Sequence, residues 1–144
     1  MSKFDGKVIL ITGAGQGIGR ALALAFAERG AVVAVNALTP MDLDETVARV
    51  RAVGGQSRAY VVDISSKLAL QTMLNEIIDQ YGHLDILIQA ASVEPRDALI
   101  EIDEWDWRRM LDSNLTGPVL LMQSAGRIMR QQGGGVMVNL VCVD

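Results

Sequence analysis

The sequence predicts an α/β fold in which helices cover both faces of a parallel sheet. Short apolar runs alternate with longer helical patterns along the chain, and the connections between them are short. This alternation is typical of strand–helix–strand units, whose parallel strands are buried on both faces. A second observation is the glycine-rich segment Thr12–Gly19, which joins the first apolar run to the first helical pattern. Together they predict a doubly wound parallel sheet.

The glycine-rich segment, Thr12-Gly13-Ala14-Gly15-Gln16-Gly17-Ile18-Gly19, follows the apolar run Val8–Ile11. A strand that turns through glycines into a helix presents free backbone N–H groups and the positive end of the helix dipole, which favours phosphate. Glycine also permits positive φ and lets a pyrophosphate approach the backbone. The spacing is Gly-x-x-x-Gly-x-Gly and no Lys-Ser/Thr follows, which excludes a P-loop. The alternative interpretation is a tight strand–helix turn that binds nothing.

Five short runs, most of them apolar, are predicted as strands: Lys7–Thr12, Ala31–Asn36, Ser57–Asp63, Leu84–Ala90 and Gly135–Val143. The segments between the strands have helical periodicity, and these helices are predicted: Ile18–Arg29, Met41–Val53, a helix from Ser65 or Ser66 to Tyr81, and Asp103–Gln132. Ala91–Ile100 is the longest predicted loop.

Cap and stop residues set the limits of these helices. Three of them are followed by Gly30, Gly54-Gly55 and Gly82, and glycine is common just beyond a helix C-terminus. Thr39-Pro40 is typical of an N-cap followed by a first-turn proline. Gly117-Pro118 lies inside the last helical pattern and predicts a kink there, because proline removes a backbone hydrogen bond.

Right-handed crossovers between five parallel strands suggest the order 3-2-1-4-5, which is a Rossmann-type arrangement. The fifth strand then forms an edge, and the segment Val136–Val143 carries no charged residue. Long apolar edges pair with other chains or aggregate. We therefore expect further strands of the same protein, or a strand of a partner, to cover this edge.

Composition narrows the class of protein. At 144 residues the chain has the size of one domain, and 50% of its residues are hydrophobic. The net charge of −4 and the lack of a basic run argue against nucleic acid as a partner. No apolar stretch is long enough to span a membrane and no signal peptide is recognised, so a cytoplasmic protein is expected. A single Cys and a single His exclude a disulfide framework and argue against a metal site.

The glycine-rich turn and its strand–helix context resemble the short-chain dehydrogenase/reductase family, and within it the β-ketoacyl reductases. The resemblance covers the whole chain, but members of the family are longer and carry a catalytic Tyr-x-x-x-Lys pair. Here Tyr60 and Tyr81 are followed four residues later by Ile64 and Asp85. The resemblance therefore implies an NAD(P)-binding Rossmann domain over residues 1–144 that lacks the family's C-terminal strands and helices.

The resemblance also implies a set of cofactor-binding residues near the carboxyl ends of the first four strands: Gly13, Gly15, Gln16, Gly17, Ile18, Gly19, Asn36, Thr39, Asp63, Ile64, Ala90, Ala91 and Ser92. Asp63 matches the family position that bonds the adenine amino group, with helix capping as the alternative. Gln89-Ala90-Ala91-Ser92 aligns with the family's Asn-Asn-Ala-Gly beside the nicotinamide ribose. Ala90 lacks a side chain that can brace neighbouring strands, and Ser92 adds a Cβ where glycine allows close approach.

The end of the second strand predicts the choice of cofactor. An acidic residue there would bind the adenosine ribose hydroxyls and repel a 2′-phosphate, but this chain has Asn36. Asn36 and Thr39 can donate to a phosphate, which slightly favours NADP(H) over NAD(H). No Arg or Lys lies nearby, and Gln16 occupies a turn position that is often basic in NADP-dependent relatives. The alternative for Asn36 is a polar residue at a strand end that faces solvent.

Two residues match catalytic positions of the family. Asn114, within Trp107–Gly117, matches the asparagine that holds a water in the family's proton relay, with a solvated or locally bonded amide as the alternative. Cys142, within Val138–Cys142, takes the place of the serine that bonds the substrate carbonyl. A thiol is a weaker donor than a hydroxyl, and a buried apolar thiol is the alternative.

The resemblance implies an NAD(P)(H)-dependent oxidoreductase that interconverts a hydroxyl and a ketone on a small-molecule substrate. The 144-residue chain alone is expected to be inactive, because the Tyr-x-x-x-Lys pair is missing. The alternative is a non-catalytic nucleotide-binding module, or a subunit completed by another chain. A homo-oligomer, dimer or tetramer, is also implied, since the family tends to use the helix matching Asp103–Gln132 as a dimer face.

Overall fold

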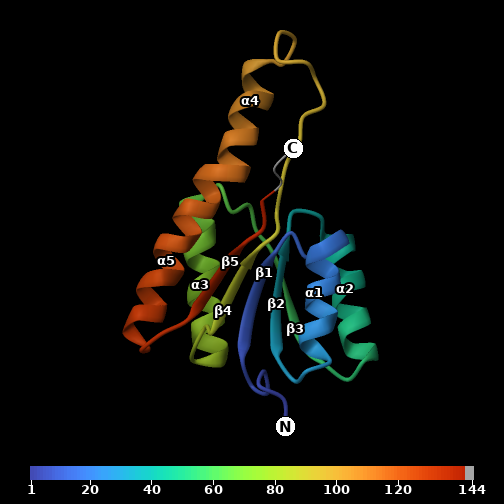
Figure 1. Ribbon diagram of the computed structural model, residues 1–144, viewed down its shortest axis with the longest axis vertical. Coiled ribbons are helices and arrows are strands. Elements are labelled where there is room, and N and C mark those ends of the chain that lie inside the picture. The colour runs from blue at the N-terminus through green and yellow to red at the C-terminus, as the bar shows by residue number, and fades with distance from the viewer. Residues whose placement is uncertain (142–144) are drawn as a thin grey trace.

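A computed structural model describes residues 1–141 and contains a five-stranded sheet in the order β3-β2-β1-β4-β5 (Figure 1). All neighbouring strands pair in parallel. The strands are β1 Val8–Thr12, β2 Val32–Ala37, β3 Gln56–Val61, β4 Ile86–Gln89 and β5 Val136–Asn139. The predicted doubly wound parallel sheet and its strand order are confirmed. The strand limits differ by a few residues, most of all for β5, which was expected to span 135–143.

Helices cover the two faces of the sheet. They are α1 Gly17–Ala27, α2 Pro40–Ala52, α3 Lys67–Tyr81, α4 Glu104–Leu111 and α5 Gly117–Gln131. Figure 1 shows α1 and α2 on one face and α3 and α5 on the other, while α4 projects beyond the sheet. No helix within residues 1–141 is both long and apolar enough to cross a membrane.

The two cores follow the two-residue alternation of the strands. Leu10 of β1 packs in a cluster with the apolar faces of α3 and α5, whereas Ile9 and Ile11 pack with α1 and α2. In β2, Ala34 belongs to the first cluster and Val35 to the second. Successive side chains of a strand point to opposite faces, so burial on both faces explains why β1 and β2 are apolar along most of their length.

The break between α4 and α5 lies earlier than expected. A kink was predicted at Gly117-Pro118, but the structure has a π-helical segment over Asp112–Thr116, and α5 begins at Gly117. Pro118 has no N–H to pair with the carbonyl four residues before it. The backbone N–H of Gly117 bonds instead to the carbonyl of Asp112, five residues back. Such π-bulges are a common cause of helix kinks. The break between α4 and α5 therefore lies just before Pro118, the residue that favours it.

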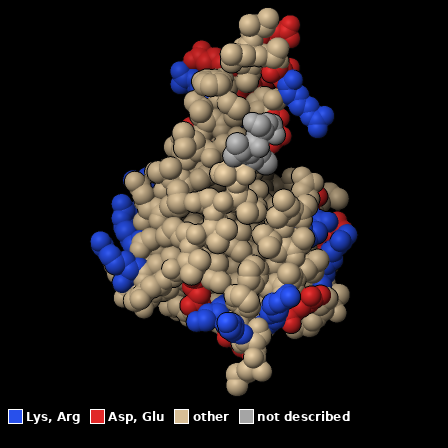
Figure 2. Space-filling model, viewed as in Figure 1, with Lys and Arg blue, Asp and Glu red and all other residues tan. Residues whose placement is uncertain are grey.

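The edge strand β5 leaves apolar surface uncovered within the described residues. Val136 is 55% exposed and Val138 is 40% exposed. Figure 2 shows that charged side chains lie mainly at the margins of the face in view and around the projecting end of the molecule, with an uncharged area between them. Trp107 of α4 is 42% exposed, and no residue of α4 is buried. The apolar edge agrees with the expectation from the sequence.

Buried polar side chains tie the strands together where they end. Thr12 pairs in register with Asn36 of β2 and Gln89 of β4, and all three are buried. The Asn36 amide nitrogen donates to the carbonyls of Tyr60 and Val62, at 2.9 and 3.0 Å. These bonds fasten β2 to the end of β3.

Replacing Asn36 by alanine should therefore destabilise the fold. Asn36→Ala removes both donors and leaves buried carbonyl groups with fewer partners, which costs about 1–3 kcal/mol. The measurement is the free energy of unfolding from urea denaturation followed by circular dichroism. Thr39→Ala is the control, because Thr39 is exposed and its side chain makes no capping bond. Equal stabilities for the two variants would contradict this role of Asn36.

Candidate functional site

A cavity of about 510 Å³ lies over the carboxyl ends of β1–β4. In open α/β sheets, ligands bind outside the carboxyl ends of the strands, near the point where the strand order reverses. Every cofactor-binding residue predicted from the sequence lines this cavity, from Gly13–Gly19 to Ser92. Further lining residues, not predicted from the sequence, lie at or just after the ends of the same strands, on α2, on α4 and in the segment 112–116: Ala37, Leu38, Asp42, Val62, Val93, Arg109 and Ser113. That these residues bind a cofactor stays a prediction.

The glycine-rich turn is packed against the segment that follows β4. Gly13 has φ +65°, and a Cβ there would lie 2.6 Å from the Ala91 backbone nitrogen. Gly19 has an ordinary φ, but a Cβ would collide with the Gly13 carbonyl. A side chain at either position would thus push apart the backbone segments that form the floor of the cavity. Gly17, with φ +56°, has open space where its Cβ would lie.

The first turn of α1 is open to the cavity. Its N-cap residue, Gln16, makes no side-chain capping bond, and the first turn contains no acidic residue. Ile18, which lines the cavity, is 66% exposed. The first N–H groups of a helix have no partner within the helix, and together with the helix dipole they form a site for anions. No side chain of the first turn competes for this site.

Side-chain bonds fix the end of β4 in place. The Thr12 hydroxyl oxygen lies 3.2 and 3.3 Å from the backbone nitrogens of Ala90 and Ala91, which donate to it. The Gln89 side-chain nitrogen donates to the Pro118 carbonyl at 3.2 Å and to Asn139 Oδ1 at 2.9 Å. We expected a loss of bracing at Ala90. The structure shows that Gln89, one residue earlier, supplies bonds to α5 and β5.

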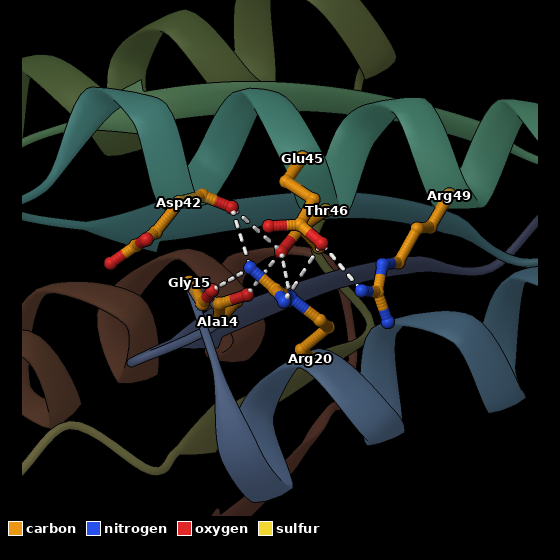
Figure 3. A network of polar contacts seen from close by, with 7 residues as sticks. All are labelled: Ala14, Gly15, Arg20, Asp42, Glu45, Thr46 and Arg49. Carbon is orange, nitrogen blue, oxygen red and sulfur yellow. Dashed lines mark hydrogen bonds and ion pairs between the residues drawn. The ribbon is translucent and has the colours of Figure 1, made fainter.

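Arg20 joins the glycine-rich turn to α2 (Figure 3). Its guanidinium donates to the carbonyls of Gly15 and Asp42 and, at 3.0 Å, to the Thr46 hydroxyl. That hydroxyl donates in turn to the Ala14 carbonyl at 2.8 Å. These bonds hold the N-terminal part of α2 against the turn. The cavity wall formed by α2 is therefore fixed relative to the turn.

Glu45 completes this network. Its carboxylate lies 3.5 Å from Arg20 Nη1 and 2.5 Å from Arg49 Nη2. The hydrogen bond from Arg49 and the nearby charges of Arg20 and Arg49 lower the pKa of Glu45. Glu45 is thus shared between Arg20 and Arg49, and the donors of Arg20 are used within the protein.

Asn36 does not act as expected from the sequence. It is 2% exposed, and its amide nitrogen donates to the carbonyls of Tyr60 and Val62. The expectation that Asn36 donates to a phosphate is therefore wrong for its side chain, and so is the alternative that it faces solvent. The neighbouring Ala37 faces the turn instead, with its Cβ 3.3 Å from the position of a Cβ on Gly15. Thr39 is the N-cap residue of α2, as predicted, and is exposed.

Asp63 has a local structural role in addition to its place at the cavity. Its Oδ1 accepts bonds from the Ser65 backbone nitrogen at 2.9 Å and the Ser65 hydroxyl at 2.7 Å. The N-cap of α3 is Ser66, whose hydroxyl accepts from the Ala69 backbone nitrogen at 3.4 Å. Oδ2 of Asp63 makes no hydrogen bond within residues 1–141. A bond from Asp63 to adenine stays a prediction.

Asn114 lies in the π-helical segment, and its amide is bonded to the segment that follows β4. Its Oδ1 accepts from the Val93 backbone nitrogen at 2.8 Å, and its Nδ2 donates to the Val93 carbonyl at 2.7 Å. This pair of bonds fastens the segment after β4 to the helix. The role of Asn114 in holding a relay water stays a prediction. Cys142 lies outside the described residues.

Neither tyrosine of the chain lines the cavity. Tyr60 lies in the core cluster beside α3, and burial raises the pKa of its phenol. A proton donor in catalysis needs contact with substrate and a pKa near the working pH, so Tyr60 is unsuited to that role. Tyr81 is the last residue of α3 and is partly buried against the same cluster.

A second hollow of about 450 Å³ lies at the amino ends of the strands. His83 and Asp85 line it, with His83 Nε2 3.0 Å from Asp85 Oδ2. Three glycines line it, Gly133–Gly135, but they follow the C-terminus of α5 and lead into β5, and among the described lining residues none begins a helix. Within residues 1–141, no three His, Cys, Asp or Glu side chains lie close enough together to hold a metal ion.

Comparisons with known proteins agree with this geometry. The family model described as short chain dehydrogenase matches residues 7–143. An uncharacterized oxidoreductase of Thermotoga maritima is 39% identical over 137 residues, which are 95% of this chain and 54% of that protein. A 3-oxoacyl-(acyl-carrier-protein) reductase of the same organism is 30% identical over 98% of this chain and 57% of its own length.

Solved structures share the fold. NAD⁺-bound xylitol dehydrogenase has a TM-score of 0.91 and 33% identity, covering 96% of this chain and 54% of that one. A metagenomic short-chain oxidoreductase in complex with NADP has a TM-score of 0.95 and 26% identity, covering 99% of this chain and 65% of that one.

The chain spans about half the length of the curated relatives that it matches. Within that half, the family match extends from the first strand to beyond β5 and takes in the glycine-rich turn. The chain belongs to the short-chain dehydrogenase/reductase family.

Proposed function

We propose that this chain forms the dinucleotide-binding part of an oxidoreductase that interconverts a hydroxyl and a ketone on a small molecule. The observation that carries the proposal is the cavity at the carboxyl ends of the strands, bordered by the open first turn of α1. The solved relatives that carry NAD⁺ or NADP support a nicotinamide dinucleotide as the ligand. Because the relatives are longer, the activity of the whole protein is part of the proposal.

The residues present fit a dinucleotide. The pyrophosphate would rest on the backbone of Gly13–Gly19 at the N-terminus of α1, where no acidic side chain repels it. Ala90, Ala91 and Ser92 would border the nicotinamide half, and Asp63 and Ile64 the adenine half. The bound cofactor supplies hydride transfer, while the protein orients it and excludes water. Neither Tyr60 nor Tyr81 lies at the cavity to supply a proton.

A non-catalytic role is the second candidate. The two tyrosines lie away from the cavity, and the apolar edge at β5 is open within the described residues. Both observations favour a nucleotide-binding module, or a subunit that another segment completes. The roles proposed for Asn114 in a proton relay and for Cys142 in binding a carbonyl belong to the completed enzyme.

The choice of cofactor needs revision. The slight preference for NADP(H) depended on Asn36 and Thr39 as phosphate donors, and the amide of Asn36 is used within the sheet. We therefore propose NAD(H) or NADP(H) without that preference. A homo-oligomer, a cytoplasmic location and a single domain over residues 1–144 stay predictions from the sequence.

A charged substitution in the first turn of α1 tests the proposed pyrophosphate site. Ile18→Glu places a carboxylate in the first turn of α1, where it interacts favourably with the helix dipole but repels a phosphate. We expect an unchanged or slightly higher melting temperature and a loss of NAD⁺ and NADP⁺ affinity of about tenfold or more, measured by isothermal titration calorimetry.

Ile18→Gln is the matched control, because it changes polarity and shape without adding charge. It should bind both dinucleotides within about threefold of the unsubstituted chain. Equal affinities for Ile18→Glu and Ile18→Gln would mean that no phosphate lies at this helix terminus.

The 144-residue chain alone should bind a dinucleotide without turning over substrate. Purified chain incubated with NADH or NADPH and a panel of ketones should oxidise the cofactor no faster than buffer does, because no tyrosine reaches the cavity. The measurement is the absorbance of the reduced nicotinamide, made alongside a binding titration. Turnover well above that background would show that the proton donor lies within these residues.

A further inference from the structure

One carboxylate stands beside the part of the cavity nearest to the glycine-rich turn. It belongs to Asp42, in the first turn of α2, which lines the cavity together with Ala37. A Cβ on Gly15 would lie 3.0 Å from the Cβ of Asp42, 3.3 Å from that of Ala37 and 3.8 Å from Asp42 Oδ2. Since β2 ends without an acidic residue, Asp42 is the carboxylate closest to this point on the cavity wall.

The backbone of Asp42 is held in this position. The Arg20 guanidinium donates to the Asp42 carbonyl at 3.1 Å and also to the Gly15 carbonyl. The Thr46 hydroxyl lies 3.1 Å from the same Asp42 carbonyl. Figure 3 shows the Asp42 carboxylate turned away from Arg20 and from this network. The residue is thus fixed through its main chain, while its side chain is available to a ligand.

The carboxylate of Asp42 has no bonded partner within residues 1–141. Asp42 forms no ion pair, and its side-chain oxygens accept no hydrogen bond there. The donors of Arg20 are directed to Gly15, Asp42, Thr46 and Glu45. Among the described residues that line the cavity, the only cation is Arg109, which comes from α4. Arg20 is the cation nearest to Gly15, but it does not line the cavity and its donors are directed to groups of the protein, so the carboxylate of Asp42 is the charge that the wall beside Gly15 presents to a ligand.

We infer that Asp42 sets the choice of cofactor, favouring NAD(H) over NADP(H). The inference depends on the proposed function, in which the pyrophosphate lies on Gly13–Gly19 and adenine lies toward β3. The adenosine ribose is then beside Gly15 and Ala37. In dinucleotide-binding folds, a carboxylate near this ribose accepts bonds from its hydroxyls and repels a 2′-phosphate. Asp42 takes this role from the first turn of α2, because β2 ends in Ala37 and supplies no carboxylate there.

A structural role for Asp42 makes a different prediction. An acidic residue in the first turn of a helix is favoured by the helix dipole. Loss of that interaction would change the melting temperature of the chain but would leave the ratio of NADP⁺ to NAD⁺ affinities unaltered. The ratio therefore separates the two roles.

The test measures dissociation constants of NAD⁺ and NADP⁺ for the 144-residue chain by isothermal titration calorimetry. Adenosine 5′-monophosphate and adenosine 2′,5′-bisphosphate are titrated as well, because they differ in the 2′-phosphate and need no nicotinamide pocket. We expect the unsubstituted chain to prefer NAD⁺ about tenfold or more, and Asp42→Asn to reduce this ratio by about tenfold. Asp42→Glu, which keeps the charge, should retain the preference, and melting temperatures report the fold of each variant.

Asp44→Asn is the matched control. The substitution makes the same change of charge on the same helix, but Asp44 is exposed and does not line the cavity. Its ratio should equal that of the unsubstituted chain. If both dinucleotides bind and Asp42→Asn leaves their ratio unchanged, or if Asp44→Asn changes it equally, the role of Asp42 is overturned while the proposed function stands. If the unsubstituted chain binds neither dinucleotide, the proposed function fails with it.

Discussion

A row of buried polar residues at the carboxyl ends of the strands is the constraint on which the site depends. Thr12 pairs in register with Asn36 on one side and Gln89 on the other. Each side chain bonds to the neighbouring segment: Asn36 to the end of β3, Thr12 to the backbone after β4, and Gln89 to β5 and α5. Buried polar groups are costly unless they are paired, so these bonds fix how the strand ends lie. The cavity floor is rigid for this reason.

The rest of the cavity wall is built on that floor. Gly13 lets the turn pass close to Ala91, and the Ala14 backbone nitrogen donates to the Asn36 carbonyl at 2.9 Å. Arg20 then ties the turn to α2. As a result, the first turn of α1 faces the cavity while the groups around it are already bonded to one another. A ligand with phosphate groups would meet donors that are in place before it binds.

The sequence predicted the strand order and the position of the cavity because these depend on short-range patterns. Apolar runs, glycines and caps are local signals, and parallel strands with right-handed crossovers leave few possible orders. The buried position of Asn36 was not predicted, although the alternation of side chains along β2 indicates it. Val35 and Ala37 share a core cluster with α1, whereas Asn36 lies one residue out of step and points to the other face. Asp42 was missed because its place beside Gly15 arises from contacts between α2 and the turn.

The central claim is that a dinucleotide binds with its pyrophosphate on the first turn of α1. Backbone amide chemical shifts of the ¹⁵N-labelled chain, recorded by NMR during titration with NAD⁺, test it most directly. We expect the largest shift changes for the amides of Gly15–Gly19, with smaller changes near Asp63 and Ala91 and none beside His83. Changes centred on the hollow that His83 lines, or no changes at saturating NAD⁺, would contradict it.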